Sequence, residues 1–250
     1  MMSANVPTDM LSASAPESIT HANLQNISAD ALVPRLAEAA YYAVLNRLLP
    51  ALRHEVAGAM QAPRMLLMVV QKRLQAAEPD QQVLADNVAT ISTLTQQASV
   101  SCMAALAWIA PGENTPVGLR SSVDKAAALL AMELFNNSLT LVNGIEDDAV
   151  TAPQTFFRSI FTGALLAFCD QHGEGGSLQV TFKPAAATSN LTGQLHLHLL
   201  PGAGGKSPAL QHAALKSRLI VWSDVQAMAQ AAGVHMEQGD SWLSLELPKP

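Results

Sequence analysis

Hydrophobic residues in the first half of the chain recur at alternating steps of four and three. The first series is Leu45, Leu49, Leu52, Val56, Ala59, Pro63, Leu66 and Val70, and the second is Leu84, Val88, Ile91, Thr95, Ala98, Cys102, Ala105 and Ile109. This spacing is typical of the a and d positions of helices that pack side by side. The polar stretch AAEPDQQ at 76–82 separates the two series. The pattern therefore predicts an antiparallel helical hairpin within residues 28–110.

A helical hairpin standing alone leaves much of its apolar surface in water. Two hairpins can bury that surface by packing together as a four-helix bundle. We therefore expect a homodimer through the helical hairpin.

The pattern changes after the segment APGENTPVG at 110–118, whose two prolines and two glycines are typical of a linker, which we assign to 111–118. Beyond it, stretches with helical spacing alternate with stretches in which every second residue is hydrophobic. Helices are expected near 121–136, 153–171 and 208–232, and strands near 139–142, 177–184, 193–200, 234–237 and 241–248. Residues 119–250 should thus form an α+β domain with a mixed or antiparallel sheet and helices on one face.

Composition and charge exclude several classes of partner. The formal net charge of −6 and the lack of a Lys or Arg cluster argue against nucleic acid. Cys102 and Cys169 lie far apart in apolar segments, which is typical of reduced thiols in a cytoplasmic protein. Residues 1–27 lack the basic start and apolar run of a signal peptide, and no apolar run reaches the roughly 18 residues of a membrane span. We expect a disordered tail at 1–27 and a soluble, cytoplasmic protein with no membrane partner.

The predicted hairpin contains one histidine, His54, in the stretch ALRHEVAGAM at 51–60. With Leu52 and Val56 at seam positions d and a, His54 falls at position f, which points away from the partner helices. A solvent-facing imidazole is largely the free base at neutral pH and can attack a phosphoryl group, and the adjacent Glu55 can accept a ring proton and fix the tautomer. An exposed histidine on a helix can also have no function, and the spacing alone does not decide between the two.

The heptapeptide HEVAGAM at His54–Met60 is similar to the phosphoacceptor box H-E-[LV]-x-x-P-[LM] of bacterial histidine kinases. It matches at the histidine, acid and hydrophobic positions and has Ala59 in place of the proline. Segments 156–182 and 218–248 resemble the helix, Gly-rich turn and strand, and the closing helix and hairpin, of the ATPase-like domain in that family. The resemblance covers residues 30–248. It implies a dimeric helical hairpin followed by a Bergerat-type (HATPase-like) α/β sandwich.

The same resemblance places the ligands of magnesium-ATP, a Glu and an Asn in the family, at Gly163 and Ala167, so magnesium would lack its protein oxygen ligands. The adenine-reading D-x-G-x-G box of the family falls at Leu200, Gly202 and Gly204. Leucine cannot accept the hydrogen bond of the adenine amino group, which leaves a donor unpaired at a cost of about 1–3 kcal/mol. We therefore expect a degenerate, pseudokinase domain, with no cofactor bound in this chain and no use of ATP.

Three other patterns compete with this interpretation. Glu133 and Asn137 in ELFNN have the separation of the nucleotide-binding pair, but a short strand and another helix follow them instead of a Gly-rich turn. The segment LLPGAGGKS at 199–207 ends like a Walker A loop but has leucine where that motif requires glycine. His196 and His198 alternate on one face of a predicted strand with no third ligand nearby, so we expect no metal site.

These observations predict a histidine phosphotransferase of a two-component phosphorelay. His54 would accept or donate a phosphoryl group with the receiver domain of a response regulator, which supplies the Mg²⁺, and Glu55 would orient the imidazole. Arg53, Gly58 and Gln61 are expected to contact that partner.

Two alternatives stay open. One is an active, divergent, ATP-dependent sensor histidine kinase whose nucleotide contacts include Glu133 and Asn137. The other is a non-catalytic dimeric scaffold that sequesters a response regulator. A phosphatase is disfavoured, because Gly58 stands where the phosphatase motif of the family has a Thr or Asn that orients water.

Overall fold

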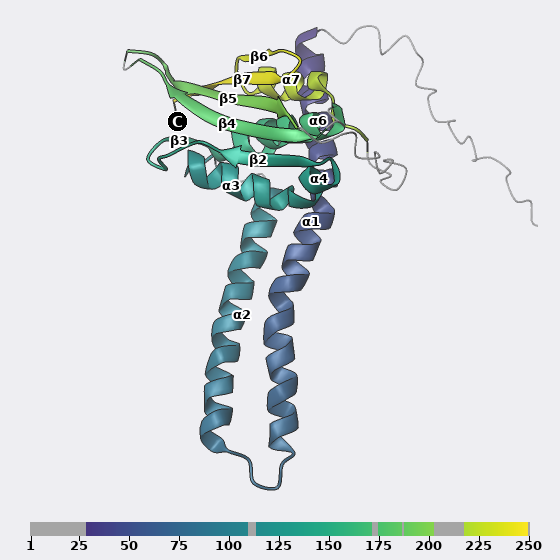
Figure 1. The fold of residues 1–250 in the computed structure, drawn as a ribbon, viewed down its shortest axis with the longest axis vertical. Helices are drawn as coiled ribbons and strands as arrows, with labels where there is room; N and C mark the ends of the chain where they lie inside the picture. Colours follow the sequence, from purple (N-terminus) through teal and green to yellow (C-terminus); the bar gives the residue numbers. More distant parts are fainter. Residues whose placement is uncertain (1–28, 110–113, 172–174, 187, 203–217, 250) are drawn as a thin grey trace, which may run out of the picture.

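The computed structural model describes residues 29–109, 114–171, 175–186, 188–202 and 218–249. Two long helices form a stalk, and two β-sheets with shorter helices form a head at one end of it (Figure 1). We use "stalk" for residues 52–109 and "head" for the described residues between 116 and 248.

Two helices make up the stalk. Helix α1 covers Ala29–Leu74 and runs unbroken through its three prolines, and helix α2 covers Gln81–Ile109, so the predicted hairpin is confirmed. Asp80 caps the start of α2, because its carboxylate accepts the backbone N–H groups of Gln82 and Val83. No helix in the described part of the chain combines the length and apolar character needed to cross a membrane.

The predicted seam is confirmed along the stalk portion of α1 and is partly wrong along α2. It is also wrong at Leu49 of α1, which is 44% exposed, while the neighbouring Leu48 is buried in the core of the head. In the stalk portion of α1 the least exposed positions are Leu52, Val56, Ala59, Pro63, Leu66 and Val70. In α2, Val88 is 57% exposed and Thr95 is also exposed, while Asn87 and Leu94 lie nearer to α1. The reason is that apolar residues of α2 lie on two adjacent stripes with the same spacing. The hairpin buries only one of these stripes.

The large sheet of the head has the strand order β2-β4-β5-β7-β6. Its strands are β2 (Leu139–Asn143), β4 (Gly176–Pro184), β5 (Leu191–Pro201), β6 (Met236–Gln238) and β7 (Trp242–Pro248). Strand β2 is parallel to β4 and the other pairs are antiparallel, so the expected mixed sheet is confirmed. A second sheet pairs β1 (Pro116–Gly118) with β3 (Thr151–Pro153).

The helices of the head pack against one face of the large sheet (Figure 1). They are α3 (Leu119–Leu129), α4 (Ala131–Asn136), α5 (Gln154–Phe156), the π-helix η2 (Phe157–Phe161), α6 (Thr162–Gln171) and α7 (Trp222–Ala231). Along the strands every second residue is buried, as Leu178, Leu197 and Leu245 are, whereas Gln179 and His198 on the other face are exposed. The alternation read from the sequence therefore corresponds to a sheet that is covered on one side.

Some predicted boundaries differ from the structure. The helix expected at 121–136 is two helices that break at Leu130. Within the described part of the helix expected at 208–232, residues 218–221 are not helical and α7 begins at Trp222. Val221 has an extended backbone and donates its N–H to the Asp224 carboxylate (3.1 Å). Part of the expected linker, Pro116–Gly118, forms β1. The expected tail at 1–27 and the beginning of the expected helix at 208–232 lie outside the described residues.

The N-terminal half of α1 belongs to the core of the head. With 46 residues against 29 in α2, α1 continues past the stalk and packs against α6 and α7 (Figure 1). Ala40, Val44 and Leu48 have no exposed surface and share one core with Phe161 and Phe168. One helix therefore serves the hairpin with its second half and the head with its first half.

Cysteine reactivity tests this packing. Burial in α6 raises the pKa of the Cys169 thiol to about 12, whereas Cys102 on α2 is partly exposed. At pH 8, iodoacetamide should therefore alkylate Cys102 of the folded protein about tenfold faster than Cys169, or more, as measured by peptide mass spectrometry. Both should react in concentrated guanidinium chloride, and equal rates in the folded protein would contradict the fold.

The same pKa shift predicts a pH dependence of stability. An unfolded chain releases the Cys169 proton near the ordinary thiol pKa of 9.0, while the folded chain retains it up to about 12. The folded state is therefore favoured less as the pH rises above about 9, and thermal unfolding should show this loss between these two values. A Cys169→Ala variant should show a smaller loss that begins only near pH 10, where the raised pKa of the Tyr41 hydroxyl contributes.

Candidate functional site

His54 lies on the outer side of α1, opposite the seam residues Leu52 and Val56, and is exposed as its heptad position predicts. The four other residues assigned to this site are exposed as well: Arg53, Glu55, Gly58 and Gln61. A Cβ placed on Gly58 would meet nothing within 4 Å. This side of the stalk is therefore open to a partner.

Glu55 does not share the face of α1 that carries His54. Adjacent helical residues point about 100° apart, so the helix itself does not fix a hydrogen bond from Glu55 to the imidazole. The orienting role of Glu55 stays a prediction.

Arg47 lies on the same face of α1 as His54. The two residues are seven positions apart, which corresponds to nearly two turns, a separation of about 10 Å along the axis and an angular difference of about 20°. Arg47 reaches into the head, where its side chain is buried. The face of α1 that presents His54 is therefore the same face that contacts the head about two turns closer to the N-terminus.

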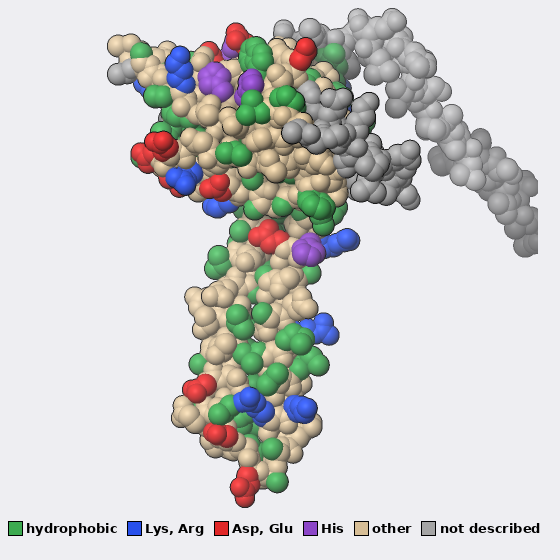
Figure 2. All heavy atoms as spheres, in the orientation of Figure 1, with side chains coloured by type: hydrophobic (Ala, Val, Ile, Leu, Met, Phe, Trp, Pro, Cys, Tyr) green, Lys and Arg blue, Asp and Glu red, His purple; other side chains and the backbone are tan. Residues whose placement is uncertain are grey.

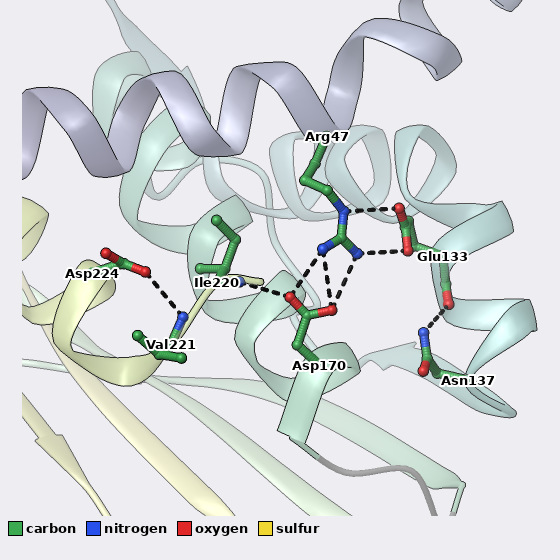
Figure 3. A network of polar contacts seen from close by, with 7 residues as sticks. All are labelled: Arg47, Glu133, Asn137, Asp170, Ile220, Val221 and Asp224. Atoms are coloured by element: carbon green, nitrogen blue, oxygen red, sulfur yellow. Dashed lines mark hydrogen bonds and ion pairs between the residues drawn. The ribbon is translucent and has the colours of Figure 1, made fainter. Parts of the chain in front are cut away.

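The guanidinium of Arg47 binds two carboxylates from different helices (Figure 3). Its Nε and Nη2 donate to the two oxygens of Glu133 on α4 (3.1 and 2.8 Å), and its Nη1 donates to Oδ2 of Asp170 on α6 (3.0 Å). Asp170 also accepts the backbone N–H of Ile220, just before α7 (2.8 Å). We call Arg47, Glu133 and Asp170 the Arg47 cluster. It joins α1, α4, α6 and the segment that leads into α7.

Arg47 is held in its charged form. Burial alone would lower the pKa of Arg47, but its hydrogen bonds and ion pairs with Glu133 and Asp170 raise that pKa above its ordinary value. The side chain of Asp170 is only 1% exposed, and the guanidinium supplies a cation next to this buried carboxylate.

Glu133 and Asn137, the alternative nucleotide pair, are both used within the fold. The two carboxylate oxygens of Glu133 bind Arg47, and Nδ2 of Asn137 donates to the backbone carbonyl of Glu133 (2.8 Å; Figure 3). Glu133 and Asn137 are thus one helical turn apart, with Asn137 directly after the end of α4 and Glu133 directed toward α1.

The face of α6 assigned to magnesium-ATP is filled by the chain itself. Gly163 and Ala167 are buried, and a Cβ placed on Gly163 would lie 2.7 Å from Cε of Met228 on α7 and 3.5 Å from Cγ2 of Val44 on α1. A glycine therefore allows α1 and α7 to close over this position. The Glu and Asn ligands that the resemblance expects at these two positions are absent, and apolar side chains of α1 and α7 occupy the space next to Gly163.

The positions matched to the adenine-reading box lie at the end of β5. Leu200 is 38% exposed and pairs with Ser177 of β4, and Gly202 packs close to the backbone of Gly176. Gly204 and most of the Walker-like segment lie outside the described residues. Strand β5 is antiparallel to both of its neighbours, whereas a Walker A loop follows a strand of a parallel sheet.

His196 and His198 lie on the open face of the large sheet. They pair across the sheet with Thr181 and Gln179 of β4. In the described part of the chain, no group of three or more His, Cys, Asp or Glu side chains is arranged to hold a metal ion.

No protein-family model matches the chain, and no curated protein sequence matches it. Among solved structures, it is similar to the histidine kinase AdeS of Acinetobacter baumannii, with 14% identity, 74% of this chain and 95% of that chain covered, and a TM-score of 0.40. It is also similar to the catalytic domain of histidine kinase ThkA, with 11% identity, 55% and 97% covered, and a TM-score of 0.41. A complex of ThkA with the response regulator protein TrrA gives 11% identity, 83% and 62% covered, and a TM-score of 0.37. Identities and TM-scores at this level do not establish a family for the chain.

The roles of Arg47 and Asp170 were not predicted from the sequence. One signal was present, because Arg47 interrupts an apolar run between Leu45 and Leu48 and stands seven residues before His54. Its partners carried no such signal, since Asp170 is 123 positions away along the chain.

Arg47→Met tests the cluster. Removing the guanidinium takes a cation away from two carboxylates, one of them the buried Asp170, so the free energy of unfolding should fall by about 3–5 kcal/mol. Urea titration followed by circular dichroism at one fixed protein concentration measures the change. The exposed Arg53→Met should change it by less than about 0.5 kcal/mol. Equal effects of the two substitutions would show that the cluster does not hold the head.

Proposed function

We propose that the chain is a histidine phosphotransferase that exchanges a phosphoryl group between His54 and the receiver domain of a response regulator. The observation that supports this most directly is a contrast between two sites. His54 is exposed on an open helix face, while the α6 face that would hold magnesium-ATP is filled by Val44 and Met228. The phosphoryl group would therefore come from another protein and not from nucleotide in this chain.

In the proposed reaction, the lone pair of one ring nitrogen of His54 attacks the phosphorus of an aspartyl phosphate. The N–P bond forms as the O–P bond breaks, and the aspartate leaves as a carboxylate. Mg²⁺ held by the receiver stabilises the charge on the transferring group. The proton on the other ring nitrogen can pass to Glu55 or to water, and the reverse reaction returns the phosphoryl group to a receiver. A receiver partner would place this chemistry in the cytoplasm.

We also propose a homodimer in which two stalks form a four-helix bundle. Met60, Leu67 and Leu74 are exposed on α1 at steps of seven, and α2 carries a second exposed apolar stripe that includes Val88 and Leu106. Apolar stripes with this spacing suit a partner helix. On α1 this stripe lies more than about 100° from His54, so the bundle would leave the histidine accessible.

Phosphotransfer to His54 is directly testable. Incubation of the chain with a phosphorylated receiver domain should give an acid-labile label on the wild type and none on His54→Ala. His198→Ala, which removes an exposed histidine of the head, should keep the label. Label that survives His54→Ala, or that never forms on the wild type with any receiver tested, would refute the proposal.

The two alternatives give different results in binding assays. A divergent kinase should bind a fluorescent ATP analogue with magnesium, whereas we expect no saturable binding at millimolar nucleotide. A scaffold should bind a receiver without ever taking up label, should be indifferent to His54→Ala, and should lose binding when Arg53 or Gln61 is replaced. Saturable nucleotide binding would favour the kinase over the phosphotransferase.

A further inference from the structure

An exposed apolar pair lies on α4, at the edge of the head that faces the stalk (Figure 1). Phe135 is 78% exposed and Met132 is 68% exposed, the highest values among the large hydrophobic side chains in the described part of the chain. Leu130 and Leu134 point into the core of the head and Glu133 points to Arg47, so the remaining side of α4 faces away from the head. Figure 2 shows hydrophobic side chains along this lower edge of the head, next to the top of the stalk.

The Arg47 cluster places this pair on the side of α1 that carries His54. Glu133 lies between Met132 and Phe135 in sequence and is bound to Arg47, and His54 follows Arg47 on the same face about 10 Å further down. The exposed pair and the imidazole therefore border the same space in the angle between head and stalk.

We propose that Met132 and Phe135 are a second contact for the receiver domain that exchanges its phosphoryl group with His54. This inference rests on the proposed function. A specific interface covers about 800 Å² on each partner, a patch roughly 30 Å across, so one centred on His54 extends about 15 Å in each direction. The step from His54 to Arg47 takes up about 10 Å of this reach, and the ion pair between Arg47 and Glu133 continues it to α4. A globular phosphoryl donor seated on this side of α1 is then placed to contact the apolar pair.

The residue types and their rigidity suit this role. Aromatic side chains and Met are enriched at the buried centre of protein interfaces. The Arg47 cluster already fixes α4, so binding a partner there orders little additional backbone. Arg53, exposed beside His54, is suited to the carboxylates that surround an aspartyl phosphate.

A second copy of the chain is the less suitable occupant. The stripe of Met60, Leu67 and Leu74 that would form the bundle lies on a different side of α1, more than about 100° from His54. A dimer formed through that stripe leaves the angle between head and stalk free.

The test compares the full chain with a Met132→Ser/Phe135→Ser double variant, using the receiver domain that labels His54. Binding measured by isothermal titration calorimetry should weaken about tenfold or more, while the rate of label transfer at saturating receiver should stay within about twofold. Both side chains are exposed, so the variant should unfold like the wild type. Val142→Ser, an exposed apolar residue on β2, is the matched control and should change neither value.

The outcomes separate this inference from the proposed function. Unchanged receiver affinity with normal label would overturn the second contact and leave His54 as the phosphoacceptor. Loss of transfer rate at saturation without loss of affinity would overturn it as well. If the double variant instead halves the mass seen by sedimentation, the pair belongs to the dimer interface. If the wild type takes no label, the proposed function fails, and the second contact fails with it.

Discussion

The guanidinium of Arg47 on α1 binds a carboxylate of α4 and a carboxylate of α6, and so joins the three helices. Hydrogen bonds of 2.8–3.2 Å to Glu133 and Asp170 are directional, and a small shift of either helix would pull a carboxylate away from the guanidinium. Apolar contacts alone would tolerate some sliding of the head along α1. The charged contacts select one register, and the position of the head relative to His54 follows from it.

The same helix determines what the head can bind. Val44 of α1 and Met228 of α7 lie next to Gly163. The close approach of these two helices to α6 depends on the absence of a side chain at this position. Any larger residue at 163 would have to push one of these side chains aside. The head therefore has the arrangement of sheet and helices that its sequence implies. The face of α6 that carries Gly163 is a packing surface for α1.

Patterns with a short period were readable from the sequence, and contacts between distant segments were not. The step of four and three located both stalk helices and the outward position of His54, and alternation located the strands around Leu178 and Leu197. The phase of α2 was ambiguous because Val88 and Asn87 belong to neighbouring stripes, and only the presence of α1 decides which is covered. Ala40, Val44 and Leu48 recur at steps of four on a stripe beside Leu45 and Leu49, and nothing local shows which of the two stripes the head covers. Arg47 has partners 86 and 123 positions away, a distance over which a single sequence carries no periodic signal.

The placement of α1 has a consequence for the order in which the protein folds as it is synthesised. The second half of α1 can pair with α2 as soon as the hairpin has left the ribosome, because these partners are close in sequence. The first half must wait for α6 and α7, since Asp170 follows Arg47 by 123 residues. Two halves of one continuous helix are therefore stabilised at different times. Until the head is complete, the apolar side of the first half has no partner within the chain and can associate with other chains.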